Sequence, residues 1–193
     1  MPDGFDIVAF AASAGGLKAL TDVLAALPGS FPASLVVVQH LDPRHRSLMA
    51  EILGRRTALQ VKEAVDGDRL EPGTAYVAPP NRHLLVNPDK SLSLTQTQLV
   101  HFVRPSADLL FESVAASHRE RAIAVVLSGS GHDGEMGVRA IKKMGGTVIV
   151  QDPKTSEFAG MPESAEHTGA VDFVLPLDEI APALQTLVTG RAS

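Results

Sequence analysis

The sequence predicts an α/β fold: a doubly wound, mostly parallel sheet in a Rossmann-like three-layer arrangement, with a small antiparallel β-hairpin insertion. Along most of the chain, short apolar runs rich in β-branched residues alternate with helical patterns. Continuous apolar runs of this kind are typical of strands covered on both faces of a parallel sheet. The stretch 60–97 is instead rich in Gly, Pro, Asn and Asp, which favours hairpins over helices.

The expected elements follow from these patterns in chain order. The apolar runs predict buried strands at 7–10, 35–38, 123–127 and 147–150, with a shorter candidate at 173–175. Leucines at helical spacing predict a helix over 17–27, which Pro28 and Gly29 end. Similar spacing predicts further helices around 48–52, 109–115, 138–144 and 180–188. The result is one strand–helix alternation with the insertion in its middle.

Length and composition limit the classes of protein. A chain of 193 residues with 45% hydrophobic and 20% charged residues is expected to form one globular domain over 1–193. The 17 basic and 22 acidic residues give a net charge of −5, which argues against a nucleic-acid partner. The absence of cysteine excludes disulfides, thiolate catalysis and cysteine metal sites. No secretory signal or membrane-spanning run is visible, so we expect a cytoplasmic protein without membrane insertion.

Three polar residues follow three of the expected strands. Ser13 comes after the first strand, His40 after the second, and Asp133 after the strand at 123–127. Because the carboxyl ends of parallel strands share one edge of the sheet, these side chains could meet there. A serine hydroxyl becomes a good nucleophile when a histidine accepts its proton and an aspartate orients that histidine. The sequence therefore predicts a serine hydrolase acting on carboxyl esters.

Each of these residues also has a plain structural interpretation. Ser13 is an acceptable helix N-cap, His40 could be a buried histidine with satisfied hydrogen bonds, and Asp133 could be a turn residue. Their occurrence together at three strand ends favours catalysis. Other carboxylates compete for the orienting role, namely Asp42, Asp152 and Asp172. His40 and His45 are five residues apart, but no carboxylate cluster completes a metal site, so no metal and no cofactor are expected.

A second motif favours a different class of protein. Residues 129–134 have the sequence G-x-G-x-x-G between a strand and a helix, and Asp152 follows where a ribose-binding acid is expected. Asp133, however, would place a carboxylate in the loop that must receive an anionic pyrophosphate. Dinucleotide binding is therefore kept as the weaker alternative. The hydrolase elbow G-x-S-x-G is not met, because Ala11 occupies its first glycine position.

Several motifs together resemble a known family, the catalytic domain of the bacterial chemotaxis protein-glutamate methylesterase. The resemblance runs from about Ile7 to about Val188. Its marks are Ala12-Ser13-Ala14-Gly15-Gly16, Val38-Gln39-His40, Tyr76-Val77-Ala78-Pro79-Pro80, Pro105-Ser106-Ala107-Asp108-Leu109-Leu110-Phe111, Leu127-Ser128-Gly129-Ser130-Gly131-His132-Asp133-Gly134 and Gly160-Met161-Pro162.

The resemblance implies hydrolysis of glutamate γ-methyl esters on the helical cytoplasmic region of chemoreceptors, with some members also deamidating receptor glutamines. It assigns the triad to Ser13, His40 and Asp133, in preference to Asp152. The backbone N–H groups of Ser130 and Ala14 are the expected oxyanion donors. Further partners that it implies are a methyltransferase or a response regulator. A non-catalytic regulatory or docking module with the same fold is the alternative from another class.

The sequence departs from the family pattern in three respects. Ala14 stands where a threonine often follows the nucleophile, and Ser130 stands where a methionine often occupies the glycine-rich loop. The third departure is that the chain shows no receiver domain, which family members usually have at the N-terminus. We therefore expect a single catalytic domain with an uncovered active site.

Overall fold

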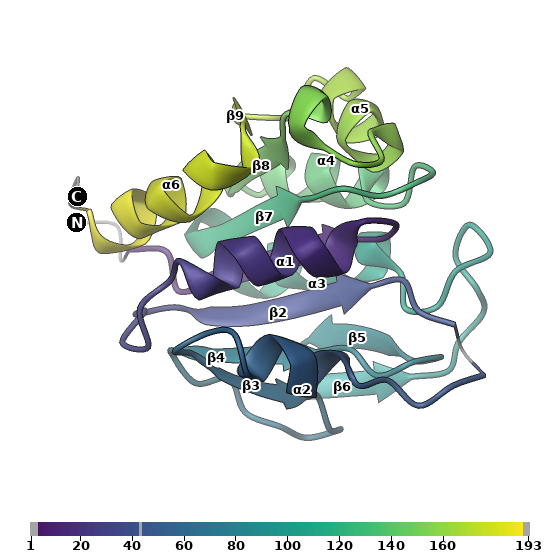
Figure 1. Cartoon of the computed structure of the whole chain (residues 1–193). Helices are drawn as coiled ribbons and strands as arrows, with labels where there is room; N and C mark the ends of the chain where they lie inside the picture. Colours follow the sequence, from purple (N-terminus) through teal and green to yellow (C-terminus); the bar gives the residue numbers. More distant parts are fainter. Residues whose placement is uncertain (1–3, 43, 191–193) are drawn as a thin grey trace.

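The computed structural model describes residues 4–42 and 44–190, and its central feature is a seven-stranded parallel sheet. The strands lie in the order β3-β4-β2-β1-β7-β8-β9 (Figure 1). Their bounds are β1 Ile7–Ala12, β2 Ser34–Gln39, β3 Gln60–Glu63, β4 Thr74–Val77, β7 Ala122–Val126, β8 Thr147–Gln151 and β9 Phe173–Leu175.

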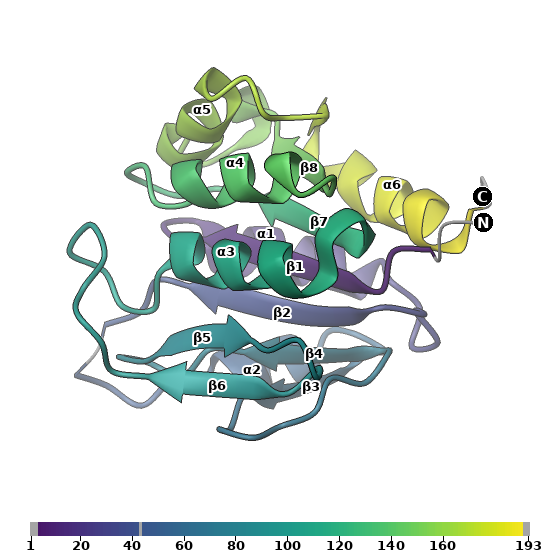
Figure 2. The same ribbon diagram turned by 180° about the vertical axis from the view of Figure 1, so that it is seen from behind.

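Helices cover both faces of this sheet. One face carries α1 (Gly16–Ala25), α2 (Met49–Gly54) and α6 (Leu177–Thr189), which lie in front in Figure 1. The opposite face, seen in Figure 2, carries α3 (Ala107–His118), α4 (Glu135–Lys143) and α5 (Gly160–His167). The antiparallel hairpin of β5 (His83–Val86) and β6 (Leu92–Thr95) packs beside α3 on that second face. The described residues also form the short 3-10 helices η1 (Arg119–Arg121) and η2 (Pro153–Thr155).

The alternation of side chains along β1 explains why two layers of helices form. Ile7, Ala9 and Ala11 point into the core beneath α3, α4 and α5, whereas Val8, Phe10 and Ala12 point into the core beneath α1, α2 and α6. All six are fully buried, so neither face of the strand could be left to solvent. The predicted three-layer, doubly wound α/β fold with a small hairpin is therefore confirmed. Along the described chain, every helix is too short or too polar to cross a bilayer.

Some local predictions were wrong. The stretch 60–97 contains one hairpin, but its first half forms β3 and β4, which pair with each other in parallel and so extend the main sheet. Strand β9 is at the edge of the sheet, with Phe173 and Val174 exposed, so it is not the buried strand expected at 173–175. Helix α5 was not expected, because it has Pro162 in its first turn and little apolar periodicity.

The direction of winding changes beside β1. From β1 the chain continues to β2 on one side, and β7 pairs with β1 on the other side. In open parallel sheets, the crevice outside the carboxyl ends at such a reversal is the usual ligand site. The carboxyl ends of β1, β2 and β7 lead into Ser13, His40 and the loop that contains Asp133.

Candidate active site

Ser13 lies immediately after β1, in close contact with the loop that follows β7. Its backbone N–H donates to Ser128 O at 3.0 Å, so the two loops are joined at this point. A Cβ placed on Gly129 would come within 2.9 Å of Ser13 Cβ and 2.4 Å of Met161 Sδ. No side chain fits at position 129 without displacing these neighbours. The glycine-rich loop therefore serves here to allow close approach to Ser13.

Gln39, the last residue of β2, fixes the positions of Ser13 and His40 relative to each other. Its Nε2 donates to Ser13 O at 2.7 Å and to His40 O at 3.1 Å. His40 N in turn donates to Ala12 O at 3.1 Å. Gln39 is buried, so these bonds are sheltered from competition with water. The backbones of the proposed nucleophile and base are thus held together by one side chain and the sheet ladder.

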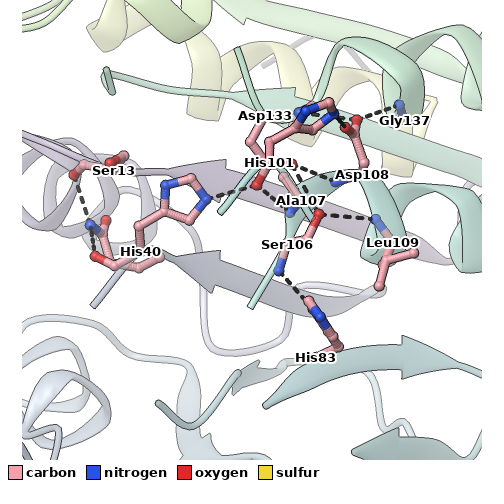
Figure 3. Close-up of polar contacts among 12 residues, drawn as sticks. Ser13, His40, His83, His101, Ser106, Ala107, Asp108, Leu109, Asp133 and Gly137 are labelled. Atoms are coloured by element: carbon pink, nitrogen blue, oxygen red, sulfur yellow. Dashed lines mark hydrogen bonds and ion pairs between the residues drawn. The ribbon is translucent and has the colours of Figure 1, made fainter. Parts of the chain in front are cut away.

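The imidazole of His40 is hydrogen bonded to Asp133. The distance from His40 Nε2 to Asp133 Oδ2 is 2.7 Å, typical of a charge-assisted contact. In Figure 3 the His40 ring lies between Ser13 and Asp133. Because Nε2 contacts the carboxylate, Nδ1 is the ring nitrogen left to exchange a proton with a substrate or with Ser13. The structure therefore brings two of the three predicted triad side chains into direct contact.

Asp133 is held at the N-terminus of α3. Its Oδ2 accepts from Ala107 N at 2.6 Å, and its Oδ1 accepts from Asp108 N at 3.1 Å and from Ser106 Oγ at 3.0 Å. Burial raises the pKa of the Asp133 carboxyl, but the hydrogen bonds from His40 and the α3 amides outweigh burial and lower this pKa below its ordinary value. Asp133 is therefore ionised at neutral pH and able to orient and stabilise an imidazolium.

Helix α4 is held in the same manner by a carboxylate at the start of α3. Asp108 Oδ1 accepts from Gly134 N at 3.0 Å and from Gly137 N at 2.8 Å. Its Oδ2 is buried without a hydrogen bond and lies 3.5 Å from His101 Nε2. Burial raises the pKa of Asp108 above its ordinary value, although the Gly137 amide opposes this change. Asp108 and Asp133 thus cap each other's helices across the site (Figure 3).

The N-cap of α3 is itself supported from the hairpin. Ser106 N donates to His83 Nδ1 at 3.1 Å, and His83 Nε2 lies 2.9 Å from Gln98 O. With Nδ1 accepting, Nε2 must bear the proton, so His83 is the neutral tautomer that donates to Gln98 O. The sequence analysis did not anticipate this buried contact between the hairpin and the α3 N-cap.

The geometry between Ser13 and His40 is looser than that between His40 and Asp133. In the part of the chain that the structure describes, Ser13 Oγ makes no hydrogen bond with His40. Such contacts are often long without substrate and tighten in the reacting complex. The predicted oxyanion donors, the amides of Ala14 and Ser130, donate to no acceptor within the described residues. Both belong to the two loops that Ser13 N joins, and the Ser130 residue is exposed.

The rival carboxylates lie in other contacts. Asp42 accepts from Arg44, Asp152 caps the short helix η2, and Asp172 pairs with Lys142 and accepts from Val148 N. Of the four candidates, Asp133 is the one that contacts His40. In the G-x-G-x-x-G loop, the Asp133 carboxylate is hydrogen bonded to His40 and to the first amides of α3. Its negative charge therefore lies where a dinucleotide-binding loop would receive an anionic pyrophosphate. Among the described residues, no three His, Asp or Glu side chains gather as a metal site.

Four supporting residues were not predicted as functional from the sequence, namely Gln39, His83, Ser106 and Asp108. Three of them, Gln39, Ser106 and Asp108, lie in motifs that carry the family resemblance, but the motifs alone indicate no role for them. A serine directly before an apolar helical run is an N-cap signature, and this signal could have identified Ser106. Nothing in the local sequence indicates that Asp108 would cap a different helix, because that contact depends on how α3 and α4 pack.

Comparison with known proteins places this geometry in a family. Residues 8–184 match the family described as CheB methylesterase. A Moorella thermoacetica protein named protein-glutamate methylesterase/protein-glutamine glutaminase is 44% identical over 193 residues, which cover 97% of this chain and 45% of that protein. A Leptospira interrogans protein, named as a putative enzyme of the same kind, is 40% identical over 177 residues, 92% of each chain. The chain thus spans about half the length of the Moorella relative but nearly all of the Leptospira one.

The fold comparison agrees with the sequence comparison. The crystal structure of the CheB methylesterase catalytic domain from Thermotoga maritima matches with a TM-score of 0.91 and 37% sequence identity. The match covers 95% of this chain and 99% of that domain.

Proposed function

Since the chain belongs to the CheB methylesterase family, we propose that it hydrolyses glutamate γ-methyl esters on chemoreceptors, yielding glutamate and methanol. The observation that supports this most directly is the 2.7 Å contact between His40 and Asp133, beside Ser13 at the carboxyl edge of β1 and β2. An ionised, buried carboxylate on an imidazole beside a serine is the arrangement that acyl transfer requires.

The proposed reaction has two steps. Ser13 Oγ attacks the ester carbonyl carbon while its proton passes to His40 Nδ1, and that proton then leaves with the methoxy group as methanol. The product of this step is a glutamyl ester of Ser13. Water then gives a proton to His40 Nδ1 and attacks this ester, and the proton returns to Ser13 Oγ as glutamate departs. Asp133 stabilises the imidazolium in both steps.

The backbone amides of Ala14 and Ser130 are the proposed oxyanion donors. They lie on the two loops that the Ser13 N to Ser128 O bond joins, and they have no competing acceptor among the described residues. Donors of this kind stabilise the negative oxygen of the tetrahedral intermediate by about 3–4 kcal/mol each. Ala14 and Ser130 stand where the family often has a threonine and a methionine, but the backbone amides at both positions are unaffected by these side-chain differences.

The same two steps would hydrolyse a glutamine side chain, with ammonia leaving in place of methanol. This is the second activity in the names of the Moorella and Leptospira relatives. We further propose that this chain acts as one catalytic domain in the cytoplasm. The proposed partners are the helical cytoplasmic region of methylated chemoreceptors and a methyltransferase or response regulator.

Replacement of the nucleophile tests the function. We expect Ser13→Ala to abolish methanol release from methylated receptor fragments while its melting temperature stays within a few degrees of the wild-type value, because a half-buried hydroxyl without hydrogen bonds contributes little stability. Ser30→Ala, in an exposed loop after α1, is the matched control and should keep full activity. Methanol release by Ser13→Ala at the wild-type rate would disprove the mechanism. Saturable binding of NAD would instead favour the dinucleotide alternative.

A further inference from the structure

Exposed apolar side chains are concentrated around the candidate catalytic groups. Among the described residues, three large apolar side chains remain exposed elsewhere, namely Val65, Phe173 and Val174. The other exposed ones lie on segments that start from or contact the edge of the sheet where the site lies: Leu17, Leu48, Ile52, Leu99, Phe102, Met136 and Phe158. An apolar rim of this kind around a polar centre marks a surface that binds another molecule.

Two hollows on this surface meet at Leu41. The larger, of roughly 340 Å³, includes Leu17, Leu48 and Ile52 in its lining. The smaller, of roughly 170 Å³, is lined by His40 and Phe102 among others. Leu41 lines both hollows, so they lie side by side with this residue between them, and the smaller one includes His40 in its lining. We refer to these two adjacent hollows together as the Leu41 groove.

One end of the Leu41 groove is a strained turn. Val100 and Val103 exchange both of their backbone hydrogen bonds, at 3.0 and 2.9 Å, so His101 and Phe102 form a two-residue hairpin turn. Both have positive φ, 49° and 65°. Turns of this type strongly prefer Asn and Gly at these two positions. A phenylalanine here costs conformational energy, and such strain persists mainly where function requires it.

The strained turn presents Phe102 to solvent. This side chain is 95% exposed, more than any other large apolar side chain of the described residues. The segment between β6 and α3, which includes the turn, projects beyond the sheet at the edge where the site lies (Figure 2). Its base is fixed by Arg104, whose guanidinium donates to Asn81 Oδ1 at 2.7 Å and to Thr97 O at 2.8 Å. An exposed aromatic ring on a segment that is held in place by hydrogen bonds is typical of an anchor at a protein interface.

The charges of the Leu41 groove indicate the character of its partner. Its described lining includes the cationic side chains of Arg46 and Arg104 and one carboxylate, Asp42. Asp42 is paired with Arg44 at 2.9 Å. Arg46 is paired with Glu51 at 3.5 Å, so these two outside partners offset each other. The groove is thus positive on balance, in a chain whose net charge is −5. A substrate whose hydrolysed sites are glutamates presents carboxylates next to each remaining ester, and these complement the two arginines.

We propose that the Leu41 groove docks the ester-bearing segment of the protein substrate, an acidic segment with apolar side chains, and that Phe102 is its anchor. The proposal rests on the proposed methylesterase function and names the surface that selects the substrate. A small ester would fill only the space beside His40, whereas the groove extends away from His40 toward Leu48 and Ile52 as well. The length of the groove is therefore matched to a chain segment.

The test replaces Phe102 by the residue that its backbone prefers. Phe102→Gly relieves the positive φ and so should not lower the melting temperature. It should raise KM for methanol release from methylated receptor fragments at least tenfold, with kcat changed less than twofold, since aromatic anchors typically contribute this much to binding. Hydrolysis of p-nitrophenyl acetate, which reaches only the hollow beside His40, should change much less than hydrolysis of the receptor fragment. Phe173→Ala, an exposed phenylalanine on the distant edge strand β9, is the matched control.

A second variant tests the other end of the groove. Leu48→Ser introduces a favourable N-cap residue at the start of α2, where Leu48 makes no side-chain cap, and should raise KM for the receptor fragment severalfold without affecting the small ester. An unchanged KM in both variants overturns the docking proposal, and so does an equal loss toward the small ester. If wild-type protein hydrolyses p-nitrophenyl acetate but releases no methanol from methylated receptor fragments, the proposed function itself is wrong.

Discussion

The N-termini of α3 and α4 meet at the candidate site, and a carboxylate from the start of the other helix caps each of them. Asp133, just before α4, accepts from the first amides of α3, and Asp108, in the first turn of α3, accepts from amides at the start of α4. Both residues are almost fully buried, at 5% and 3% exposure. The local motif, burial and charge are therefore nearly the same at the two positions.

The two carboxyls nevertheless have opposite pKa changes. The pKa of Asp133 is lowered, whereas that of Asp108 is raised, and burial acts to raise both. The difference lies in the hydrogen bonds and the neighbouring charges. Each Asp133 oxygen accepts at least two hydrogen bonds, including one from His40, while Asp108 Oδ2 accepts none and the negative charge of Asp133 raises the pKa of Asp108 further. The comparison shows that donors to each oxygen, more than the helix terminus itself, decide whether a buried carboxylate is held in its charged form.

The largest effect is expected for Asp133→Asn. The amide would preserve the volume but remove the charge that orients and stabilises the His40 imidazolium, so kcat for methanol release should fall by about 10⁴-fold. The substrate KM should change little, because the carboxylate is buried behind His40. Steady-state kinetics together with a far-UV circular dichroism spectrum would check this. A kcat of Asp133→Asn within tenfold of the wild-type value would contradict the catalytic role that distinguishes Asp133 from Asp108.

A smaller effect is expected for Ser106→Ala. This change removes a donor to Asp133 Oδ1 and the side-chain cap of α3 at Leu109 N. We expect a loss of about 1 kcal/mol in the free energy of unfolding and a fall in kcat of roughly tenfold. Ser106→Thr keeps the hydroxyl and should restore most of both quantities. A purely structural role would lower stability without changing kcat of the folded fraction.

The smallest effect on activity is expected for Asp108→Asn. The Asn oxygen can still accept from Gly134 and Gly137, so kcat should stay within about threefold of wild type. Because the folded-state pKa of Asp108 lies above its unfolded value of about 4, its contribution to stability is full below that pH and is lost as pH rises through the folded-state pKa. The stability of the variant relative to wild type should therefore increase with pH across this window, as measured by urea unfolding.

The Asp133 carboxyl should show the opposite pH dependence. Its folded-state pKa is depressed, so its contribution to stability is present above about pH 4 and is lost as pH falls through the lower folded-state value. Urea unfolding of wild type and Asp133→Asn between pH 2 and pH 7 should show the two curves converging at the acidic end. Curves that converge at neutral pH instead would contradict the assigned direction.

The sequence predicted the sheet more fully than the site. Runs such as 35–38 are apolar on both faces, and this property of the chain alone indicates a covered parallel strand. Strand β3 was not recognised because it is exposed and polar, and α5 was not recognised because it has Pro162 in its first turn and little apolar periodicity. Ser13, His40 and Asp133 were proposed because strand ends share an edge. The roles of Gln39 and Asp108 depend on side-chain contacts between distant segments, which no local pattern encodes.

The mutual capping of α3 by Asp133 and of α4 by Asp108 also affects how this site is assembled and which substitutions it tolerates. Asp133 has its α3 donors only when the start of α3, about 26 residues earlier in the chain, has already packed against α4. The carboxylate that would act on His40 is therefore available only in the completed tertiary structure. Partial unfolding of either helix would abolish turnover before most of the sheet is lost. Substitutions of residues packed between α3 and α4, even far from Ser13, would then lower catalytic activity as well as stability.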